Sequence, residues 1–327
     1  MKKSFYVFLF LFALILMVLL LFFVFVNQQI PTISKTLLIS FYATQIPMFD
    51  PDSNKIVGEI QVDSPLSTIK ILRYNDLIYV IAIDRIILVN PNSTIKKIVS
   101  ANSTLRDALI EDGKLYTLGF IQIPEGCSGI QICRGYNFTR AHNSYITIFD
   151  PSLSELSRIE FKQHRFDGFT ILNNSFFASS YYESKVYKIS GDKIVNEIQL
   201  PQLSLPSQVL SFNNKIIVIG KRGIFAISSD LSKFDVLMNE SVCNFYARGF
   251  IYNNKLYATC STGNKTIVYD LTQNKIVKQI SMQTPFHILG FKNRIYVSSE
   301  KKLNIIDPNK DEINATIDFY MPIIAIG

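Results

Sequence analysis

The 327-residue sequence contains no tryptophan, three histidines and four cysteines. It also lacks the short motifs of common enzyme sites: there is no Gly-x-Ser-x-Gly turn, His-Glu-x-x-His pair, phosphate loop or dinucleotide fingerprint. Its basic residues are scattered singly, with no run of five, so a nucleic-acid partner is not expected. These absences exclude several catalytic classes and favour a protein that is not an enzyme.

Short strand-like runs recur along the chain, and no helical period separates them. The second run of each expected unit begins at Leu37, Leu77, Lys114, Ser175, Lys215, Lys255 and Arg294. The successive spacings are 40, 37, 61, 40, 40 and 39 residues, and all but one fit the period of a propeller blade. The pattern predicts an all-β fold, a seven-bladed β-propeller of four-stranded blades over residues 37–327.

Turn formers end most of the third strands, and four of them precede a proline. They are Asp50, Asn90, Asp150, Asp270 and Asp307. The first unit begins at its second strand, whereas residues 321–327 match the innermost strand of a unit. The C-terminal strand is therefore expected to complete the first blade and to close the ring without a free edge.

Two of these units show a familiar repeat pattern. The run Ile-Tyr-Val-Ser-Ser from Ile295 leads to Asp307, and the run Leu-Tyr-Ala-Thr from Leu256 leads to Asp270. These units resemble the YVTN-type β-propeller repeats of bacterial and archaeal surface proteins. The resemblance covers nearly all of residues 37–327 and implies a propeller at the cell surface. Its motifs encode blade geometry and specify no ligand.

The N-terminus carries a long apolar segment, the 22 residues from Phe5 to Val26. That length spans a bilayer as a helix, and no cleavage site for a signal peptide follows it. We expect residues 1–26 to be an uncleaved, single-pass anchor in the cell membrane, with a cleaved signal as the alternative. Residues 27–36 would be a short tether to an extracellular propeller, with Lys2 and Lys3 in the cytoplasm.

The cysteines and the asparagines also favour an extracytoplasmic protein. The cysteines suggest two disulfides, Cys127–Cys133 within one loop and Cys243–Cys260 at one end of the sixth blade; free thiols are the alternative in a cytosolic protein. Their spacing does not suggest a zinc site. Seven Asn-x-Ser/Thr sequons lie in or beside expected turns, as candidate glycosylation sites: Asn92, Asn102, Asn137, Asn173, Asn239, Asn264 and Asn314.

The third unit is about twenty residues too long. Its excess lies at residues 121–143, a loop with three glycines and with Arg134, Arg140 and His142. Long loops in compact domains are usually functional or disordered, and a disulfide argues against disorder. The loop is a candidate recognition element beside the channel mouth, and structural elaboration is the alternative.

Further candidate ligand-binding residues lie where the innermost strands begin, around the mouth of the central channel. They are Arg106, Asp107, Asp167 and His287, together with His164, Arg165 and Gln208. Two functions remain open. One is a membrane-anchored module of the cell envelope that binds a protein or a glycan and needs no cofactor. The other is a propeller hydrolase or lactonase-like enzyme, in which Asp107, Asp167 and His287 would hold a divalent cation or act as acid and base.

Overall fold

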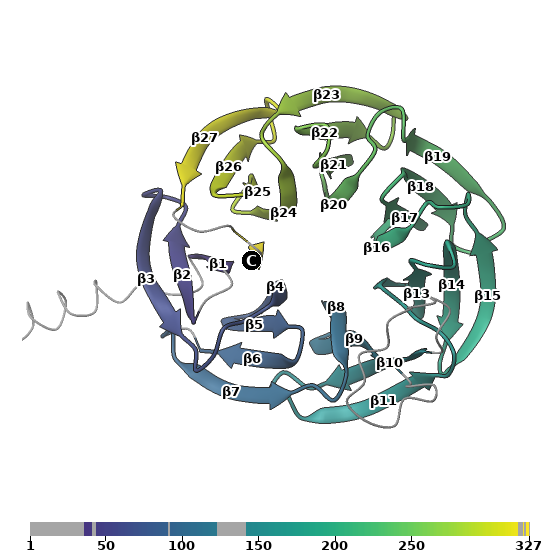
Figure 1. Ribbon diagram of the computed structural model, residues 1–327, viewed down its shortest axis with the longest axis horizontal. Coiled ribbons are helices and arrows are strands. Elements are labelled where there is room, and N and C mark those ends of the chain that lie inside the picture. The colour runs from purple at the N-terminus through teal and green to yellow at the C-terminus, as the bar shows by residue number, and fades with distance from the viewer. Residues whose placement is uncertain are drawn as a thin grey trace, which may run out of the picture.

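The computed structural model describes residues 36–40, 44–90, 92–122, 142–319, 323 and 325–326. Their regular elements form seven four-stranded sheets, arranged as blades around one axis (Figure 1). The predicted all-β, seven-bladed propeller is therefore confirmed. No helix among the described residues is long and apolar enough to cross a membrane, and the expected anchor, residues 1–26, lies outside them.

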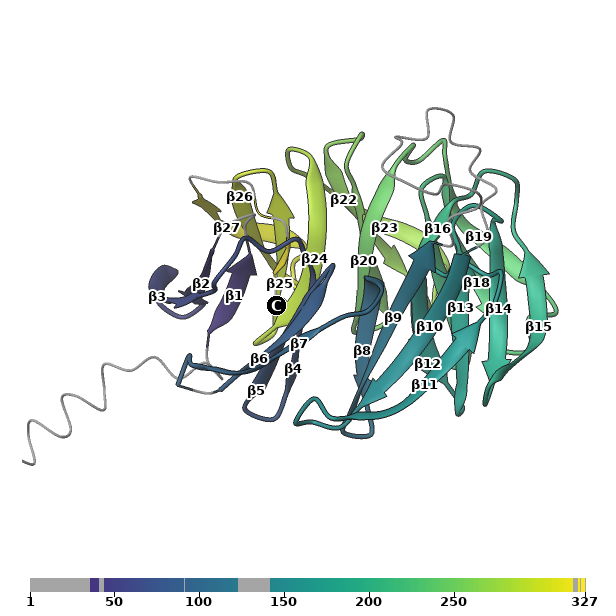
Figure 2. The same ribbon diagram turned by 60° about the horizontal axis from the view of Figure 1, so that its bottom comes forward.

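The strands follow one another blade by blade. Blade one consists of β28 (Ala325–Ile326), β1 (Leu37–Ser40), β2 (Gln45–Asp50) and β3 (Lys55–Gln61), and blade two of β4 (Thr68–Tyr74), β5 (Leu77–Ala82), β6 (Arg85–Val89) and β7 (Ile95–Ser100). Blade three consists of β8 (Thr104–Glu111), β9 (Lys114–Gln122), β10 (His142–Phe149) and β11 (Glu155–Phe161), and blade four of β12 (Gly168–Leu172), β13 (Ser175–Ser180), β14 (Lys185–Ser190) and β15 (Lys193–Gln199). Blades five to seven consist of β16 (Pro206–Phe212), β17 (Lys215–Gly220), β18 (Gly223–Ser228) and β19 (Phe234–Asn239); β20 (Tyr246–Tyr252), β21 (Lys255–Cys260), β22 (Lys265–Asp270) and β23 (Lys275–Ser281); and β24 (Pro285–Phe291), β25 (Arg294–Ser299), β26 (Lys302–Asp307) and β27 (Glu312–Asp318). The first strand of each blade lies innermost, around the axis (Figure 1, Figure 2).

The ring closes through the C-terminal strand, as predicted. β28 pairs with β1, with Ile39 opposite Ile326 and Ser40 opposite Ala325. The paired segment is shorter than the expected inner strand, since only Ala325 and Ile326 are assigned to β28. Two side chains of blade seven also contact blade one. Lys292 Nζ lies 2.7 Å from Asp52 Oδ2, and Arg294 Nη1 donates a 2.6 Å hydrogen bond to the carbonyl of Pro51. The C-terminal strand therefore completes blade one, and side chains of blade seven hold blade one in addition.

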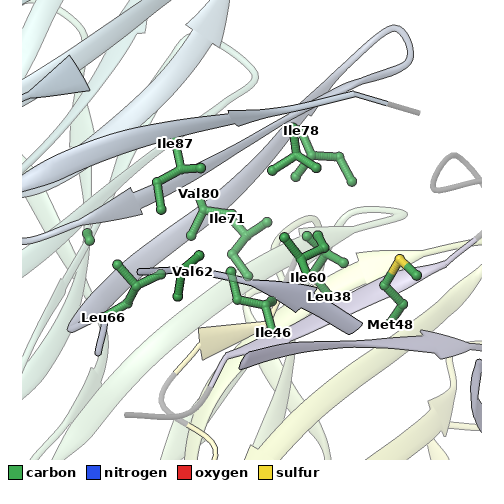
Figure 3. Close-up of a cluster of buried hydrophobic side chains, with 12 residues drawn as sticks. Leu38, Ile46, Met48, Ile60, Val62, Leu66, Ile71, Ile78, Val80 and Ile87 are labelled. Carbon is green, nitrogen blue, oxygen red and sulfur yellow. The ribbon is translucent and has the colours of Figure 1, made fainter. Parts of the chain in front are cut away.

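A separate apolar cluster fills each of the seven interfaces between neighbouring blades. Between blades one and two, Leu38 and Ile46 face Ile71 and Val80 (Figure 3). The closing interface is built in the same way, with Ile39 and Ile326 packed with Tyr296 of blade seven. Because each blade buries its faces against two neighbours, the stability of every blade depends on a closed ring.

The turns between the third and fourth strands use the expected acidic residues. Asp150 Oδ1 accepts hydrogen bonds from the backbone amides of Ser152 and Ser154, both at 2.8 Å. Asp270 and Asp307 accept from the amides two residues further on in the same way. Such bonds favour the charged carboxylate, and the pKa of Asp150 lies below its usual value mainly because of the Ser154 and Ser152 hydrogen bonds.

The outermost strand of every blade contains a β-bulge. In blade one, Met48 pairs with Gly58 while Phe49 pairs with Ile56, which leaves Val57 without a counterpart. The same register shift recurs in the other six blades. Bulges twist an edge strand and interrupt its row of free hydrogen-bonding groups, which protects the seven sheet edges against pairing with other chains.

Closure predicts a clear difference between two isoleucine substitutions. Ile326→Ala removes a side chain that is 6% exposed in the closing interface, whereas Ile313→Ala trims one that is 37% exposed on the outermost strand β27. Ile326→Ala should lower the free energy of unfolding of the full-length protein by about 2–4 kcal/mol. Ile313→Ala should change it by less than about 1 kcal/mol. Denaturant unfolding measures both values, and equal losses would contradict closure by β28.

Candidate functional site

One position in six of the seven innermost strands forms a belt around the channel. It lies four residues before the last residue of the strand and is occupied in β4, β8, β12, β16, β20 and β24 by Lys70, Asp107, Gly168, Gln208, Arg248 and His287. We call these six residues the polar belt. All of them except Gly168 line a cavity of about 250 Å³. The cavity also contacts Ile326 of β28, so it lies within the ring of innermost strands.

Register shifts at the start of the innermost strands set the direction of these side chains. In β8 the pairing jumps from Leu105 to Asp107, so Arg106 is the extra residue of a bulge. Similar shifts occur at this point in β4, β16, β20 and β24. Bulges commonly re-aim side chains next to functional sites. Here the bulge of β8 turns the Arg106 guanidinium toward Phe120 and Asp107 into the belt, and both residues line the cavity.

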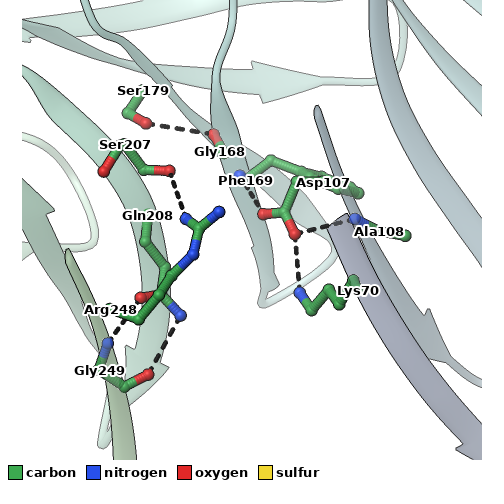
Figure 4. Close-up of polar contacts among 10 residues, drawn as sticks. All are labelled: Lys70, Asp107, Ala108, Gly168, Phe169, Ser179, Ser207, Gln208, Arg248 and Gly249. Carbon is green, nitrogen blue, oxygen red and sulfur yellow. Dashed lines mark hydrogen bonds and ion pairs between the residues drawn. The ribbon is translucent and has the colours of Figure 1, made fainter. Parts of the chain in front are cut away.

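Asp107 ties three blades together (Figure 4). Its Oδ1 accepts hydrogen bonds from Lys70 Nζ at 2.7 Å and from the Ala108 amide at 2.8 Å, and its Oδ2 accepts one from the Phe169 amide at 3.2 Å. Only 12% of this side chain is exposed. The structure therefore places Asp107 at the channel, as expected, with both oxygens engaged in holding blades two, three and four.

Arg248 extends across the channel side of blade five toward blade four (Figure 4). Its Nη1 donates a 3.4 Å hydrogen bond to the Ser207 carbonyl, and the side chain of Gln208 exchanges two hydrogen bonds with Gly249, at 2.8 and 3.1 Å. Gly168 allows blades four and five to approach each other closely, because a Cβ atom on Gly168 would lie 2.6 Å from the carbonyl oxygen of Ser207. Burial lowers the pKa of Arg248, and the nearby Asp107 carboxylate opposes that shift.

His287 lies beside Arg248 in the belt. Burial, with a further contribution from the positive charge of Arg248, lowers the pKa of its imidazole to about 3. Its backbone amide donates to Ser298 Oγ at 3.1 Å, which fixes the strand at this point. The side chain of His287 is therefore a neutral hydrogen-bonding group at neutral pH.

The titration of His287 is directly testable. NMR of labelled histidines in the full-length protein should show no protonation of His287 between pH 8 and 5. Arg248→Gln should raise its pKa, whereas Arg158→Gln on the outer strand β11 should not. Because the folded-state pKa is below the unfolded value, this group stabilises the fold fully above pH ~6.5 and progressively less as the pH falls toward 3. A wild-type His287 that titrates near its ordinary value would contradict this environment.

A second group of side chains surrounds the mouth of the channel. The Arg165 guanidinium lies 4.5 Å from the ring centres of both Phe120 and Tyr182, and Arg106 lies 4.8 Å from Phe120. Arg165 also pairs with Asp167 at 3.3 Å. Burial raises the pKa of Asp167, and the charges of Arg165 and Arg106 and the Tyr181 amide oppose that shift.

This group continues onto blades five and six. Tyr182 contacts Tyr181 edge-on at 5.0 Å, and Lys221 lies between Tyr181 and Phe245, at 5.0 and 4.7 Å from their ring centres. We call the whole set the mouth cluster: Arg106, Phe120, Arg165, Asp167, Tyr181, Tyr182, Lys221 and Phe245. It holds three cations and one carboxylate. Cations held over aromatic rings in this way are favourably placed to meet anionic groups.

The long loop of blade three begins and ends beside the mouth cluster. His142 opens β10, and its ring meets Phe120 edge-on at 5.2 Å. Arg134 and Arg140 lie outside the described residues, so their predicted role as binding residues stays a prediction.

The structure joins Cys243 to Cys260 in a disulfide, as predicted, whereas Cys127 and Cys133 lie outside the described residues. Six of the seven sequon asparagines are described and all six are exposed: Asn92, Asn102, Asn173, Asn239, Asn264 and Asn314. Asn137 lies outside the described residues. This exposure is compatible with glycosylation, which stays a prediction.

The three residues proposed to hold a cation do not converge. Within the described parts of the chain, no group of three or more His, Cys, Asp or Glu side chains could hold a metal ion. Asp107 and His287 line the cavity, but Asp167 belongs to the mouth cluster and accepts a 3.1 Å hydrogen bond from the Tyr181 amide. The arrangement offers cations, an amide and a neutral imidazole, which suit the binding of an anion.

The sequence-based predictions did not include Lys70 and Arg248, two of the charged residues in the belt. Both could have been found by counting four residues back from the end of each innermost strand, the offset that Asp107, Gln208 and His287 share. Counting forward from the expected start of each strand does not locate these residues, because bulges lie between the start of the strand and the belt.

Comparison with known proteins supports the fold. No family model matches the sequence, and no curated protein matches it. Apo AztD from Citrobacter koseri matches with a TM-score of 0.58 and 12% identity, over 89% of this chain and 96% of that one. Virginiamycin B lyase from Staphylococcus aureus gives 0.58 and 14%, over 78% and 84%. Dihydro-heme d1 dehydrogenase NirN, in complex with DHE, gives 0.58 and 12%, over 88% and 64%.

These similarities define the chain as a β-propeller of seven four-stranded blades. Two of the matched proteins are a dehydrogenase and a lyase, and at such low identity the likeness concerns the fold alone. The function has to be argued from the channel and its mouth.

Proposed function

We propose that this protein is a binding module of the cell envelope, which holds an acidic protein or glycan against the mouth of the propeller. The observation that carries the proposal is the mouth cluster, where Arg165 and Lys221 each lie between two aromatic rings. Three cations face one carboxylate there, so an approaching anionic group meets net positive charge. Tyr182, which is 45% exposed, offers apolar contact at the same place.

The geometry of Arg165 suits recognition rather than catalysis. Its guanidinium is held by two rings and by Asp167, so little side-chain freedom is lost when a partner binds. A planar guanidinium donates pairs of hydrogen bonds to carboxylate, sulfate or phosphate groups. Neither the mouth cluster nor the polar belt combines a nucleophile with an adjacent free base. The metal-dependent hydrolase therefore has less support than a binding module.

The proposed location is extracytoplasmic, with residues 1–26 as a single-pass membrane anchor and residues 27–36 as a tether. The 22-residue apolar length of Phe5–Val26 and the flanking Lys2 and Lys3 support it. The Cys243–Cys260 disulfide suits an oxidising compartment. The resemblance to YVTN-type surface propellers and the exposed sequons agree with the same location.

The mouth cluster can be tested with two matched arginine variants. Arg165→Gln should weaken binding of the full-length protein to an immobilised acidic polymer about tenfold, because a charge-assisted hydrogen bond is lost. Arg158→Gln is the control, since Arg158 also has one carboxylate partner, Glu155 at 2.8 Å, but lies on the outer strand β11. Polygalacturonate and polyglutamate columns distinguish a glycan from a protein partner. Equal retention of both variants on both columns would contradict the proposal.

The anchor is tested by intact-mass measurement of the protein purified from native membranes. We expect a chain that still contains residues 1–26, because no cleavage site follows the apolar segment. A mature N-terminus between residues 27 and 35 would show a cleaved signal instead, and the propeller would then be released from its proposed anchor.

A further inference from the structure

The polar belt carries one cation that the described chain does not neutralise closely. Lys70 and Asp107 form an ion pair at 2.7 Å, so their charges cancel. Arg248 makes one side-chain hydrogen bond among the described residues, the 3.4 Å contact to the Ser207 carbonyl, and its neighbour His287 is neutral. The guanidinium lines the cavity (Figure 4). A deep cation with so few partners is costly, and a bound monoanion would remove that cost.

A second ring of side chains lies immediately beyond the belt. Side chains two residues apart in a strand point to the same face, so the position two residues after the belt also faces the channel. In four of the strands that line the cavity this position is occupied by Leu72, Leu210, Phe250 and Leu289, which also line it and which we call the apolar belt. In β8 the position is occupied by Leu109, which packs against the apolar cluster between blades three and four. All four residues of the apolar belt are partly exposed, in keeping with their place beside the cavity. The channel is therefore charged at one level and apolar at the next.

We propose that the channel binds a small amphipathic carboxylate, with its carboxylate group at Arg248 and its hydrocarbon chain between the side chains of the apolar belt. His287 and Gln208 lie at the same level as Arg248 and can donate or orient further hydrogen bonds. The cavity of about 250 Å³ admits a single small molecule. Lys70 pairs with Asp107, and Arg106, which also lines the cavity, interacts with the Asp167 carboxylate, so a monoanion matches the charge of Arg248. The site shares only Arg106 with the mouth cluster, and Arg165 and Lys221, which carry the acidic partner proposed above, do not line the cavity.

Calorimetric titration of the full-length protein with simple carboxylates tests the chemistry. Butyrate should bind more tightly than acetate, and hexanoate more tightly than butyrate, by about fourfold for each added methylene. Butyramide and butylamine, which keep the chain but lose the negative charge, should give no heat of binding. Inorganic phosphate should bind more weakly than hexanoate. Phosphate binding as tight as that of hexanoate, or no gain with chain length, would overturn the amphipathic site.

Variants locate the site. Arg248→Gln should weaken hexanoate binding at least tenfold, and Leu289→Asn should abolish the preference for hexanoate over acetate while acetate still binds. Arg158→Gln, which removes one positive charge from the outer strand β11, should leave the binding of both ligands unchanged.

A second measurement needs no variant. In the wild-type protein, hexanoate should shift the NMR signals of the His287 ring, whereas butylamine should not. Equal affinities of Arg248→Gln and Arg158→Gln, or no hexanoate-dependent shift at His287, would contradict a channel site even if either variant folds poorly.

Discussion

The pairing of β28 with β1 is the constraint on which the rest of this structure depends. A blade has two broad faces, and each face is covered only if a neighbouring blade is present on that side. In an open array the two terminal blades would each expose an apolar face. The C-terminal strand removes that possibility because it completes blade one with residues from the far end of the chain. Lys292 and Arg294 of blade seven contact the turn between the third and fourth strands of blade one. Lys255 of blade six contacts Asp311 in the corresponding turn of blade seven in the same way.

Closure also creates the surface at which we propose binding. The polar belt is assembled from one residue in each of six strands that are far apart in sequence, and it becomes a ring only when the blades surround the axis. Five of these strands contain a bulge at the belt, and in β8 the bulge gives two neighbouring charged side chains different directions. Asp107 faces the belt and holds blades together, while its neighbour Arg106 joins the mouth cluster. The same device separates a channel suited to a small anion from a mouth suited to a larger acidic partner.

Much of the fold follows from local sequence signals. The strand starts, the Asp-based turns, the seven blades and the closing strand were all predictable, because each depends on alternation or on turn chemistry within a few residues. The Cys243–Cys260 pair followed from antiparallel register in one blade.

The sites were predictable only in part. Asp107 and His287 were expected at the channel and lie there, but Asp167 was grouped with them and instead pairs with Arg165. Its partners depend on the loop between blades three and four, which has no repeat pattern. Arg248 was missed because its role depends on a bulge and on a hydrogen bond to the Ser207 carbonyl in the neighbouring blade. Such contacts between blades have no signal in the local sequence.

A crystal structure of the protein with 4-bromobutyrate tests the central claim most directly, because anomalous scattering locates the bromine independently of the carboxylate. The account predicts a closed ring with β28 paired to β1, the carboxylate at Arg248, and the bromine among Leu72, Leu210, Phe250 and Leu289. A bromine peak outside the channel, an opposite orientation with bromine at Arg248, or an open first blade would contradict it.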